Sequence, residues 1–503
     1  MNPLGSDRET FVSGDLAALI VRHLRAPPSP TCLGFIDGAG ATRSMGWAEL
    51  GERATGFAQR CAELGASAGE VIAIAWHHGP EAISAWVGAV IGGFVPTFVP
   101  TNDPALAQSL GTRVRLTTGP DTLASWPALP LASDVVSADV ALVQRTSGTT
   151  GQHRPVAIGQ RRLLAQIWGL GRALELSSDD VIASCLPLHH DMGLVSTVLL
   201  PLVCGVSCVH LDPLVWRADS GALPRAIAAS RATLTWLPPS ALARLARHPG
   251  KKVADLSSLR QIVCGGEVVP ARTLREFAAR FLAWGVRPEI IGTGWGMAEN
   301  VAAITHSPPG RAPTELRVAW SSFAPGCLVE VASDDDDTLT LVSSGVPIDG
   351  TQVAVRDDDG NEVVDGVLGA LYVRGACQAD EVRWHSTGDV GLIHDGEVFV
   401  CGRRDELLQA DTRWIPPHEV ELAAASIAGV RPGRVAAVVD GNGALVVLVE
   451  SPDARAVDTQ QIADAVEHHV RRRPRVVIVA PDSLPKSTSG KLGRRRCAAL
   501  VGP

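Results

Sequence analysis

Residues that could handle phosphate are concentrated in one stretch of the chain, 143–156 (VQRTSGTTGQHRPV). The stretch combines hydroxyl side chains, two glycines and the cation Arg154, and it follows an apolar run. Backbone N–H groups and hydroxyls in such a loop can surround phosphates while an arginine neutralises their charge. The stretch therefore predicts a nucleoside triphosphate site, with contacts from Thr146, Ser147, Gly148, Thr149, Thr150 and Gly151.

The same composition is also typical of a solvated turn, so the stretch alone does not decide the function. It differs from the phosphate loop of the P-loop NTPases, because no Gly-Lys-Ser/Thr closes it and its glycines are too close together. The segments that follow in the chain are needed to distinguish a nucleotide site from a turn.

Further segments carry groups suited to nucleotide or acid chemistry. A histidine pair opens the run 189–194 (HHDMGL) and could place an imidazole at a pocket mouth, although histidine pairs are more often structural. Trp295 precedes Glu299 by four residues, so one loop could stack on a base and coordinate magnesium. The remaining segments are 264–267 (CGGE), 386–389 (STGD), 402–405 (GRRD) and 484–492 (LPKSTSGKL).

Length and composition exclude several classes of protein. A chain of 503 residues is long enough for a large domain with a smaller partner. A net charge of −8 without a basic segment argues against nucleic acid as the main partner and favours a small-molecule substrate. The ten cysteines lack Cys-x-x-Cys pairs and zinc spacing, so we expect buried, reduced thiols that bind no metal. We also expect a cytoplasmic protein, because the first residues do not resemble a secretory signal and no apolar stretch is long enough for a membrane span.

Alternating helices and strands must position these groups. Helical spacing over 46–64 precedes an apolar strand at 70–76, and a helix over 80–91 precedes a strand at 94–100. A further helix is expected over 159–174, several residues after the phosphate stretch. This alternation predicts a large layered α/β domain with mostly parallel strands.

The second half of the chain predicts two smaller units. Short strands and Asp-Gly turns over 326–403 indicate a β-rich subdomain, which completes an N-terminal domain of residues 1–403. Residues 404–503 predict a small, mobile α+β C-terminal domain. The acidic runs 334–337 and 357–359 are expected to be solvated turns rather than cation sites.

In their order and separations, the chemistry-bearing segments resemble the superfamily of adenylate-forming enzymes. This superfamily includes acyl-CoA synthetases, the adenylation domains of peptide synthetases, luciferases and fatty acyl-AMP ligases. The resemblance extends from about Gly46 to the C-terminus and is greatest to the fatty acyl-AMP ligase branch, on the residues 189–194 and 343–347 (SSGVP). It implies ATP-dependent adenylation of a carboxylic acid with release of pyrophosphate, followed by transfer to a carrier protein or another acceptor in a biosynthetic pathway. The implied cofactors are ATP and Mg²⁺, while coenzyme A or phosphopantetheine as acceptor stays open.

The resemblance also implies a role for each matching residue. The phosphate loop would hold the triphosphate, Glu299 would coordinate Mg²⁺, and Lys491 would reach the carboxylate and the α-phosphate with help from Arg154. Asp405 would be the hinge of the C-terminal domain. Base and ribose contacts would come from Gly265, Gly266, Glu267, Trp295, Gly296, Met297, Asp389 and Arg403, and the acyl pocket would include His190, Trp236 and Ser240.

Three departures from the family pattern bear on the chemistry. The residues 153–155 (HRP) replace Pro-Lys-Gly, which keeps a charge but presents a planar guanidinium. Trp295 replaces a tyrosine and keeps the ring without the phenol. Thr412 stands where thioester-forming relatives have glycine, and a side chain there would obstruct coenzyme A. The last departure favours an acyl-AMP ligase over an ordinary CoA ligase.

Three other functions stay open. The chain could be a CoA ligase for an aryl or medium-chain acid, or it could activate a non-carboxylate oxyanion such as nitrite, as a diazotase would. A non-catalytic scaffold is disfavoured because the polar residues of the expected site are all kept, namely Glu299, Asp389, Arg403 and Lys491. The arginine runs 471–473 and 494–496 could dock an acidic acyl carrier protein, although such runs are more often solvated helix ends.

Overall fold

The structure is a computed structural model that describes most of the chain. The described residues are 2–37, 41–76, 78–100, 114–117, 126, 128–131, 137–146, 154–250, 253–332, 337–410, 413–453, 457–486 and 492–501. Several residues singled out in the sequence lie outside these ranges: Ser147, Gly148, Thr149, Thr150, Gly151, His153, Thr412, Lys491 and the acidic residues 334–336.

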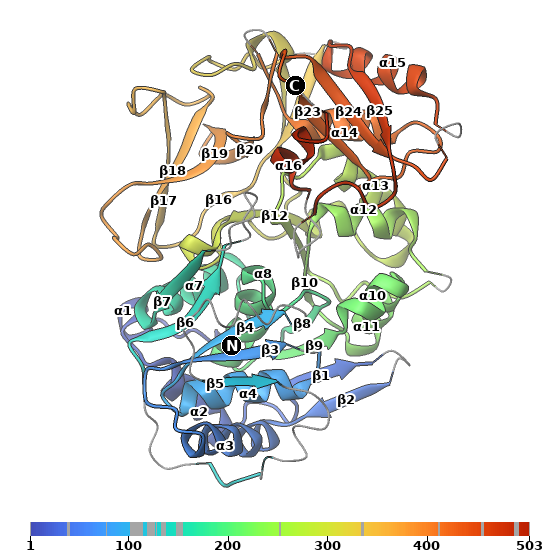
Figure 1. The fold of residues 1–503 in the computed structure, drawn as a ribbon. Coiled ribbons are helices and arrows are strands. Elements are labelled where there is room, and N and C mark those ends of the chain that lie inside the picture. Colours follow the sequence, from blue (N-terminus) through green and yellow to red (C-terminus); the bar gives the residue numbers. More distant parts are fainter. Residues whose placement is uncertain are drawn as a thin grey trace.

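A large, mostly parallel sheet runs through the N-terminal half and confirms the expected α/β fold (Figure 1). The pairs β1–β9, β9–β8, β8–β10, β10–β11 and β11–β12 are parallel, and both edges end in antiparallel strands. The strand order is β16 (Val346–Pro347), β13 (Ala303–His306), β12 (Ile291–Gly296), β11 (Gln261–Gly265), β10 (Leu234–Leu237), β8 (Val181–Ser184), β9 (Ser207–Leu211), β1 (Leu33–Ile36) and β2 (Thr42–Met45).

A second parallel sheet and a hairpin precede the main part of the large sheet. The second sheet has the order β4 (Val95–Pro100), β3 (Val71–Trp76), β5 (Val114–Thr117). The hairpin pairs β6 (Val140–Arg145) with β7 (Pro155–Gly159), so a strand separates the phosphate stretch from helix α7 (Gln160–Ala173). This strand was not expected from the sequence, because its short run begins with a proline.

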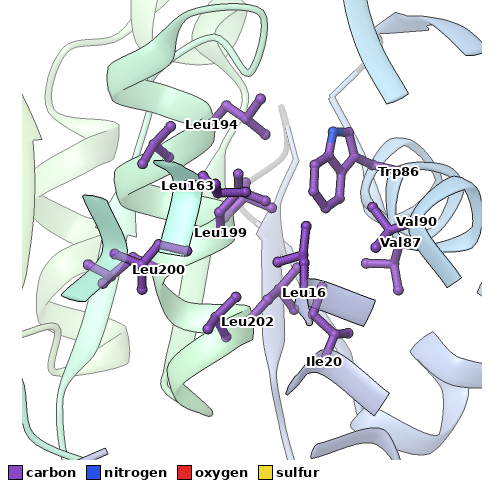
Figure 2. Close-up of a cluster of buried hydrophobic side chains, with 14 of the residues drawn as sticks. Leu16, Ile20, Trp86, Val87, Val90, Leu163, Leu194, Leu199, Leu200 and Leu202 are labelled. Carbon is purple, nitrogen blue, oxygen red and sulfur yellow. The ribbon is translucent and has the colours of Figure 1, made fainter. Parts of the chain in front are cut away.

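Helices cover these sheets and share one apolar core with them. The expected helices are confirmed with bounds close to those inferred from periodicity. They are α1 (Arg8–Val12), α2 (Leu16–Arg25), α3 (Trp47–Glu63), α4 (Pro80–Ile91), α8 (Asp191–Leu194), α9 (Leu200–Cys204), α10 (Pro213–Ala218), α11 (Ala222–Ser230), α12 (Pro239–Arg247) and α13 (Ala271–Phe281). Figure 2 shows leucines of α7, α8 and α9 facing side chains of α2 and α4 within this core.

The buried helical segment 191–204 changes its winding in the middle. Between α8 and α9, η1 (Val195–Leu199) is a π-helix, and the Thr197 hydroxyl donates to the Gly193 carbonyl at 2.6 Å. Pro201 has no N–H to offer the Thr197 carbonyl four residues earlier, and the wider π turn makes room for its ring. A Cβ on Gly193 would lie 2.2 Å from the Pro187 carbonyl oxygen, so only glycine fits where this segment begins.

The β-rich part of the chain lies above the large sheet in the view of Figure 1. An antiparallel sheet has the order β17 (Thr351–Arg356), β18 (Gly369–Gly375), β19 (His385–His394), β20 (Glu397–Arg403). A hairpin of β14 (Glu315–Ala319) and β15 (Thr338–Val342) stands beside it. The expected Asp-Gly turn between β19 and β20 is present, with positive φ at Asp395 and Gly396.

The C-terminal part forms its own α+β unit, as expected. Its sheet has the order β23 (Val435–Val439), β24 (Leu445–Glu450), β25 (Arg475–Val479), and it is preceded by the hairpin β21 (Leu408–Ala410) and β22 (Arg413–Ile415). Three helices accompany it, α14 (Pro417–Ala425), α15 (Thr459–Val470) and α16 (Arg494–Ala498). The boundary between residues 403 and 404 stays a prediction.

One apolar cluster connects this C-terminal part with the hairpin β14–β15. The cluster includes Trp320 and Phe323 on one side of residue 404 and Trp414 on the other. The Trp414 N–H donates to the Phe323 carbonyl at 3.1 Å, and the ring of His469 stands edge-on to Trp320 with 6.4 Å between centroids. The two parts are therefore packed together in the described orientation.

Two further sequence expectations can be compared with the structure. The ten cysteines are free thiols, and all but Cys327 are buried, so the expectation of buried thiols is corrected at this one exposed position. Burial raises the pKa of the Cys185 thiol to about 12. None of the helices in the described ranges has the length and apolar character needed to cross a membrane.

Candidate active site

Four residues from three strands form a hydrogen-bonded group that we call the nucleoside end: Trp295 of β12, Thr387 and Asp389 of β19, and Arg403 of β20. The indole Nε1 of Trp295 donates to Asp389 Oδ2 at 2.9 Å. Arg403 Nη1 donates to the Thr387 carbonyl at 2.9 Å and lies 3.4 Å from Asp389 Oδ1. The fold thus brings together residues that the sequence separates by about a hundred positions.

The local backbone explains why this carboxylate is held in place. Asp389 and Arg403 are opposite each other in the register of β19 and β20. The Asp389 N–H donates to the Thr387 hydroxyl at 3.1 Å, and that hydroxyl donates to the Leu371 carbonyl at 2.8 Å. A Cβ on Gly388 would lie 2.8 Å from Arg403 Nη2, so a side chain there would displace the guanidinium.

Trp295 is more deeply buried than a stacking plate for adenine would be. Only 8% of the residue is exposed, because its ring packs in a cluster with aliphatic side chains of β13 and of the β17–β20 sheet, namely Ile304, Val355, Leu371, Val373 and Val398. The placement differs from the exposed plate expected from the sequence. Base stacking by Trp295 stays a prediction.

The loop after Trp295 needs glycine and holds Glu299. A Cβ on Gly296 would lie 1.9 Å from the Ala302 carbonyl oxygen, at the register shift between β12 and β13. Met297 is half-buried and its N–H donates to the same Ala302 carbonyl at 2.8 Å. Glu299 follows in the short helix η4 (Ala298–Asn300), half-buried.

The Glu299 carboxylate suits a magnesium ion that is held mainly by phosphates. It takes part in none of the ion pairs of the described residues. Mg²⁺ is usually bound through one or two carboxylates together with substrate phosphates and water. Within the described ranges no group of three His, Cys, Asp or Glu side chains could hold a metal by itself. A metal at Glu299 would therefore depend on the nucleotide.

Arg162 of α7 is a site residue that the sequence analysis missed. Its guanidinium donates to three main-chain carbonyls: Glu299 at 2.7 Å, Ala157 at 3.0 Å and Cys377 at 3.0 Å. Burial lowers the pKa of this guanidinium. Its only sequence signal is a cation in the first turn of a helix, where the helix dipole disfavours positive charge. Arg162 ties the Glu299 loop to the strand that follows the phosphate stretch.

The ends of the phosphate stretch are held together at the tip of the β6–β7 hairpin. The Thr146 N–H donates to the Arg154 carbonyl at 3.0 Å, and the Arg154 N–H donates to the Thr146 hydroxyl at 3.1 Å. The Arg154 side chain is exposed. Because β7 intervenes, phosphates here would rely on loop N–H groups and cations rather than on the N-terminus of α7.

A second group of residues, which we call the acid end, is packed rather than hydrogen-bonded. It consists of His189, His190, Met192, Trp236 and Gly266. The two imidazole rings lie 4.6 Å apart, and Met192 Cε is 3.8 Å from the position of a Cβ on Gly266. Trp236 of β10 is only 3% exposed.

The remaining acyl-pocket and base residues are placed less closely. Ser240 is exposed on α12, and Glu267 is exposed after β11. A Cβ on Gly265 would lie 2.4 Å from the Gly294 carbonyl oxygen, so glycine permits the close approach of β11 and β12. The structure groups His190 with the acid end and leaves Ser240 on the surface.

The expected hinge is tied to the segment that follows Lys491. Asp405 pairs with Arg495 of α16 at 2.6 Å, and Glu406 pairs with Arg494 at 2.8 Å. Arg494 also pairs with Glu421 at 2.8 Å. Helix α16 begins three residues after Lys491, so these ion pairs connect the hinge to the segment expected to carry catalysis.

Much of the charge of the two arginine runs is matched by nearby carboxylates. Arg471 pairs with Asp337 at 3.1 Å, and Arg473 pairs with Asp464 at 2.9 Å and with Glu467. Arg494 and Arg495 are paired at the hinge as described. Docking of an acidic carrier protein on these runs therefore gains little support from the structure.

The parallel sheet, the β-rich part and the nucleoside end together define an enzyme of the adenylate-forming class. A comparison with family models agrees, because the model of the AMP-binding enzymes matches residues 105–381. The protein Rv1013 of Mycobacterium tuberculosis is 30% identical over 411 residues, which cover 76% of this chain and 75% of that protein. The chain belongs to the family of AMP-binding enzymes, and the expected class of AMP-forming ligase is confirmed.

Other relatives and solved structures are consistent with this assignment. The long-chain-fatty-acid–AMP ligase FadD32 of Mycolicibacterium smegmatis is 27% identical over 451 residues, covering 76% of this chain and 71% of that one. A 4-hydroxyphenylalkanoate adenylyltransferase of M. tuberculosis is 25% identical over 577 residues, covering 98% and 93%. A solved fatty acyl-adenylate ligase, from a study of the E. coli and L. pneumophila enzymes, has a TM-score of 0.87, 21% identity and 98% coverage of both chains, which confirms the fold.

Proposed function

We propose that this enzyme uses ATP to adenylate a carboxylic acid and then transfers the acyl group to an acceptor other than coenzyme A. The observation that carries the proposal is the nucleoside end, where Asp389 is held by Trp295 and Arg403 in a geometry that suits a ribose. The names of the relatives support adenylation, because they include an acyl-AMP ligase and an adenylyltransferase.

The reaction has two steps. A carboxylate oxygen of the acid attacks the α-phosphorus of ATP, the bond from this phosphorus to the oxygen bridging to the β-phosphate breaks, and pyrophosphate leaves. A nucleophile, such as the phosphopantetheine thiol of a carrier protein, then attacks the acyl carbon and AMP leaves while the thiol proton passes to solvent. Both steps build negative charge on oxygens, so nearby cations stabilise the transition states.

The chain offers its own groups for the first step. Lys491 would contact the α-phosphate and the carboxylate, and Arg154 would neutralise the outer phosphates at the hairpin tip. Glu299 would hold Mg²⁺ against the phosphates, where the ion supplies further charge neutralisation. Arg162 keeps the Glu299 loop in place through its carbonyl contacts.

The acid is proposed to be apolar and to contain an aromatic ring or a compact chain. The acid end presents imidazole, indole and thioether groups, which suit an apolar acid. A relative that covers 98% of this chain is named for 4-hydroxyphenylalkanoates. The acceptor proposal depends on Thr412, which stands where a glycine would admit coenzyme A.

Mass spectrometry of products tests this proposal. The enzyme would be incubated with ATP, Mg²⁺ and a panel of aryl, fatty and small acids, each with and without coenzyme A. We expect an acyl-AMP that persists when coenzyme A is present. Conversion to acyl-CoA would contradict the acceptor proposal, product only with nitrite would replace the carboxylic acid, and no adenylate from any substrate would favour a scaffold.

The variant Lys491→Ala tests the catalytic assignment. We expect pyrophosphate release to fall by about 100- to 1,000-fold, as for other lost transition-state contacts. Lys486→Ala is the matched control, because Lys486 lies in the same segment and donates to the Gly433 carbonyl at 2.7 Å. Similar rates for both variants would contradict the role of Lys491.

A further inference from the structure

Trp295 occupies the position at which the resemblance expects a stacking ring, but its polar edge makes the contact of interest. Its indole N–H donates to Asp389 Oδ2 at 2.9 Å, while the ring packs in the cluster that contains Val373 and Leu371. We propose that Trp295 is a positioning residue, whose N–H orients the Asp389 carboxylate to accept hydrogen bonds from the ribose hydroxyls of ATP and AMP. This inference rests on the proposed adenylation function.

The burial of both groups makes this hydrogen bond important. Trp295 and Asp389 are each 8% exposed. A buried carboxylate loses hydration and needs donors in its place, and an indole N–H without an acceptor is costly as well. Arg403 Nη1 lies 3.4 Å from the other oxygen of Asp389, a longer contact than that of Trp295. The shorter contact is therefore the better candidate for fixing the orientation of the carboxylate.

The carboxylate keeps acceptor sites for a ligand. Its two oxygens offer about four lone-pair directions in total, more than the contacts from Trp295 and Arg403 use. The hydroxyls of a ribose are hydrogen-bond donors that fit such acceptors. Trp295 can thus orient Asp389 without blocking it.

The replacement of tyrosine by tryptophan gives this hydrogen bond a fixed direction. A phenol can donate or accept, whereas an indole N–H can only donate. Trp295 therefore keeps Asp389 in the role of acceptor. The bond also links β12 of the large sheet to β19 of the antiparallel sheet, so it sets the distance between the segment expected at the base and the carboxylate expected at the ribose.

Binding calorimetry with two nucleotides separates this role from a structural one. AMP and 2′,3′-dideoxy-AMP would be titrated into the wild-type protein and into Trp295→Phe, which keeps an aromatic ring but lacks the N–H. We expect Trp295→Phe to weaken AMP binding by about 10-fold, the effect of one hydrogen bond to a charged group. Binding of dideoxy-AMP should change little, so the preference for AMP should fall by nearly the same factor.

Val373→Ala is the matched control, because Val373 packs in the same cluster as Trp295 and has no polar group. It should lower thermal stability while leaving the preference for AMP over dideoxy-AMP unchanged. Equal weakening of both nucleotides by Trp295→Phe would overturn the proposal and indicate a role at the base or in packing. An unchanged affinity for both would overturn it as well.

The binding measurement needs no acid and no turnover, so it is independent of the proposed function. A wild-type protein that binds AMP with a preference over dideoxy-AMP, but adenylates no acid, would contradict the proposed function alone. A wild-type protein that does not distinguish the two nucleotides would overturn the role of Trp295, whatever acid is activated.

Discussion

The nucleoside end and the acid end lie on the same large sheet, but different forces fix their side chains. At the nucleoside end, Trp295 and Arg403 direct N–H groups at the Asp389 carboxylate. At the acid end, Met192 touches the backbone near Gly266, and Trp236 is buried among apolar side chains.

The difference teaches how each end can recognise a ligand. Directional hydrogen bonds select a group of constant chemistry, such as a ribose, and lose much when one partner is removed. Packed apolar side chains select by shape, where one methylene more or less changes selectivity only about 10- to 200-fold. We therefore expect substitutions at the nucleoside end to change the use of ATP sharply, and substitutions at the acid end to change the choice of acid.

The largest effect is expected for Asp389→Ala. This change removes the proposed ribose acceptor and leaves the Trp295 N–H without its partner. We expect kcat/KM for ATP to fall by about 100-fold, with the KM for the acid little changed. Steady-state kinetics with each substrate varied in turn would measure this. Asp395→Ala, in the exposed turn of the same hairpin, is the control and should behave as wild type.

A smaller effect is expected for Arg162→Lys. Lysine keeps the charge but cannot donate to three carbonyls in a planar arrangement. We expect kcat/KM for ATP to fall by about 10-fold, because the Glu299 loop loses one of its supports. The neighbour Arg161, which pairs with Glu9 and Glu381 on the surface, provides the control Arg161→Lys. Equal kinetics for the two variants would remove Arg162 from the nucleoside end.

A still smaller effect on rate is expected at the acid end. Trp236→Phe shortens a buried ring, so bulkier acids should gain relative to the wild-type preference by a factor of about 10, while the KM for ATP stays constant. Competition between acids of different size, read by mass spectrometry, would measure the change. Trp284→Phe alters another buried ring, in a separate cluster, and should leave the preference unchanged. A change in the KM for ATP instead would break the distinction between the two ends.

The smallest effect concerns pH and should not distinguish the two ends. Burial lowers the pKa of His306, on β13 opposite Gly294, to about 4, and burial together with His78 lowers the pKa of His210, on β9, to about 3. The unfolded chain binds protons near pH 6.5 that the folded chain refuses, so stability falls as the pH drops from about 6.5 toward 4. Each histidine contributes at most about 1.4 kcal/mol per pH unit in this window.

The variant His210→Leu tests this pH dependence. Urea unfolding at several pH values between 4 and 7 should show a shallower loss of stability in the variant than in the wild type. An identical slope would mean that His210 is protonated in the folded protein, against the pKa given by its burial.

The comparison also explains what the sequence could predict. The alternation of helices and strands, and the polar residues Asp389 and Arg403, were predictable because periodicity and charged groups stand out in a sequence. The bounds of α4, inferred as 80–91, agree with the structure. At the acid end, Trp236 has the same composition and spacing as any core residue, so the sequence could not separate a pocket wall from ordinary packing.

Two other features were out of reach for a tertiary reason. The contacts of Arg162 with carbonyls of three segments exist only after the chain has folded, and the burial of Trp295 depends on the β17–β20 sheet. Strand β7 was missed because a pairing partner, rather than its own short sequence, makes it a strand.

The apolar cluster shared by Trp320, Phe323 and Trp414 has a consequence for any motion about Asp405. A rotation that separates the two parts must bring some of this apolar surface into water, at about 25 cal/mol for each Å² exposed. Because that cost shrinks on cooling and in urea, temperature and solvent act on the orientation of the C-terminal part without touching the catalytic groups. The enzyme would then have a thermal control over its cycle that is independent of its substrates.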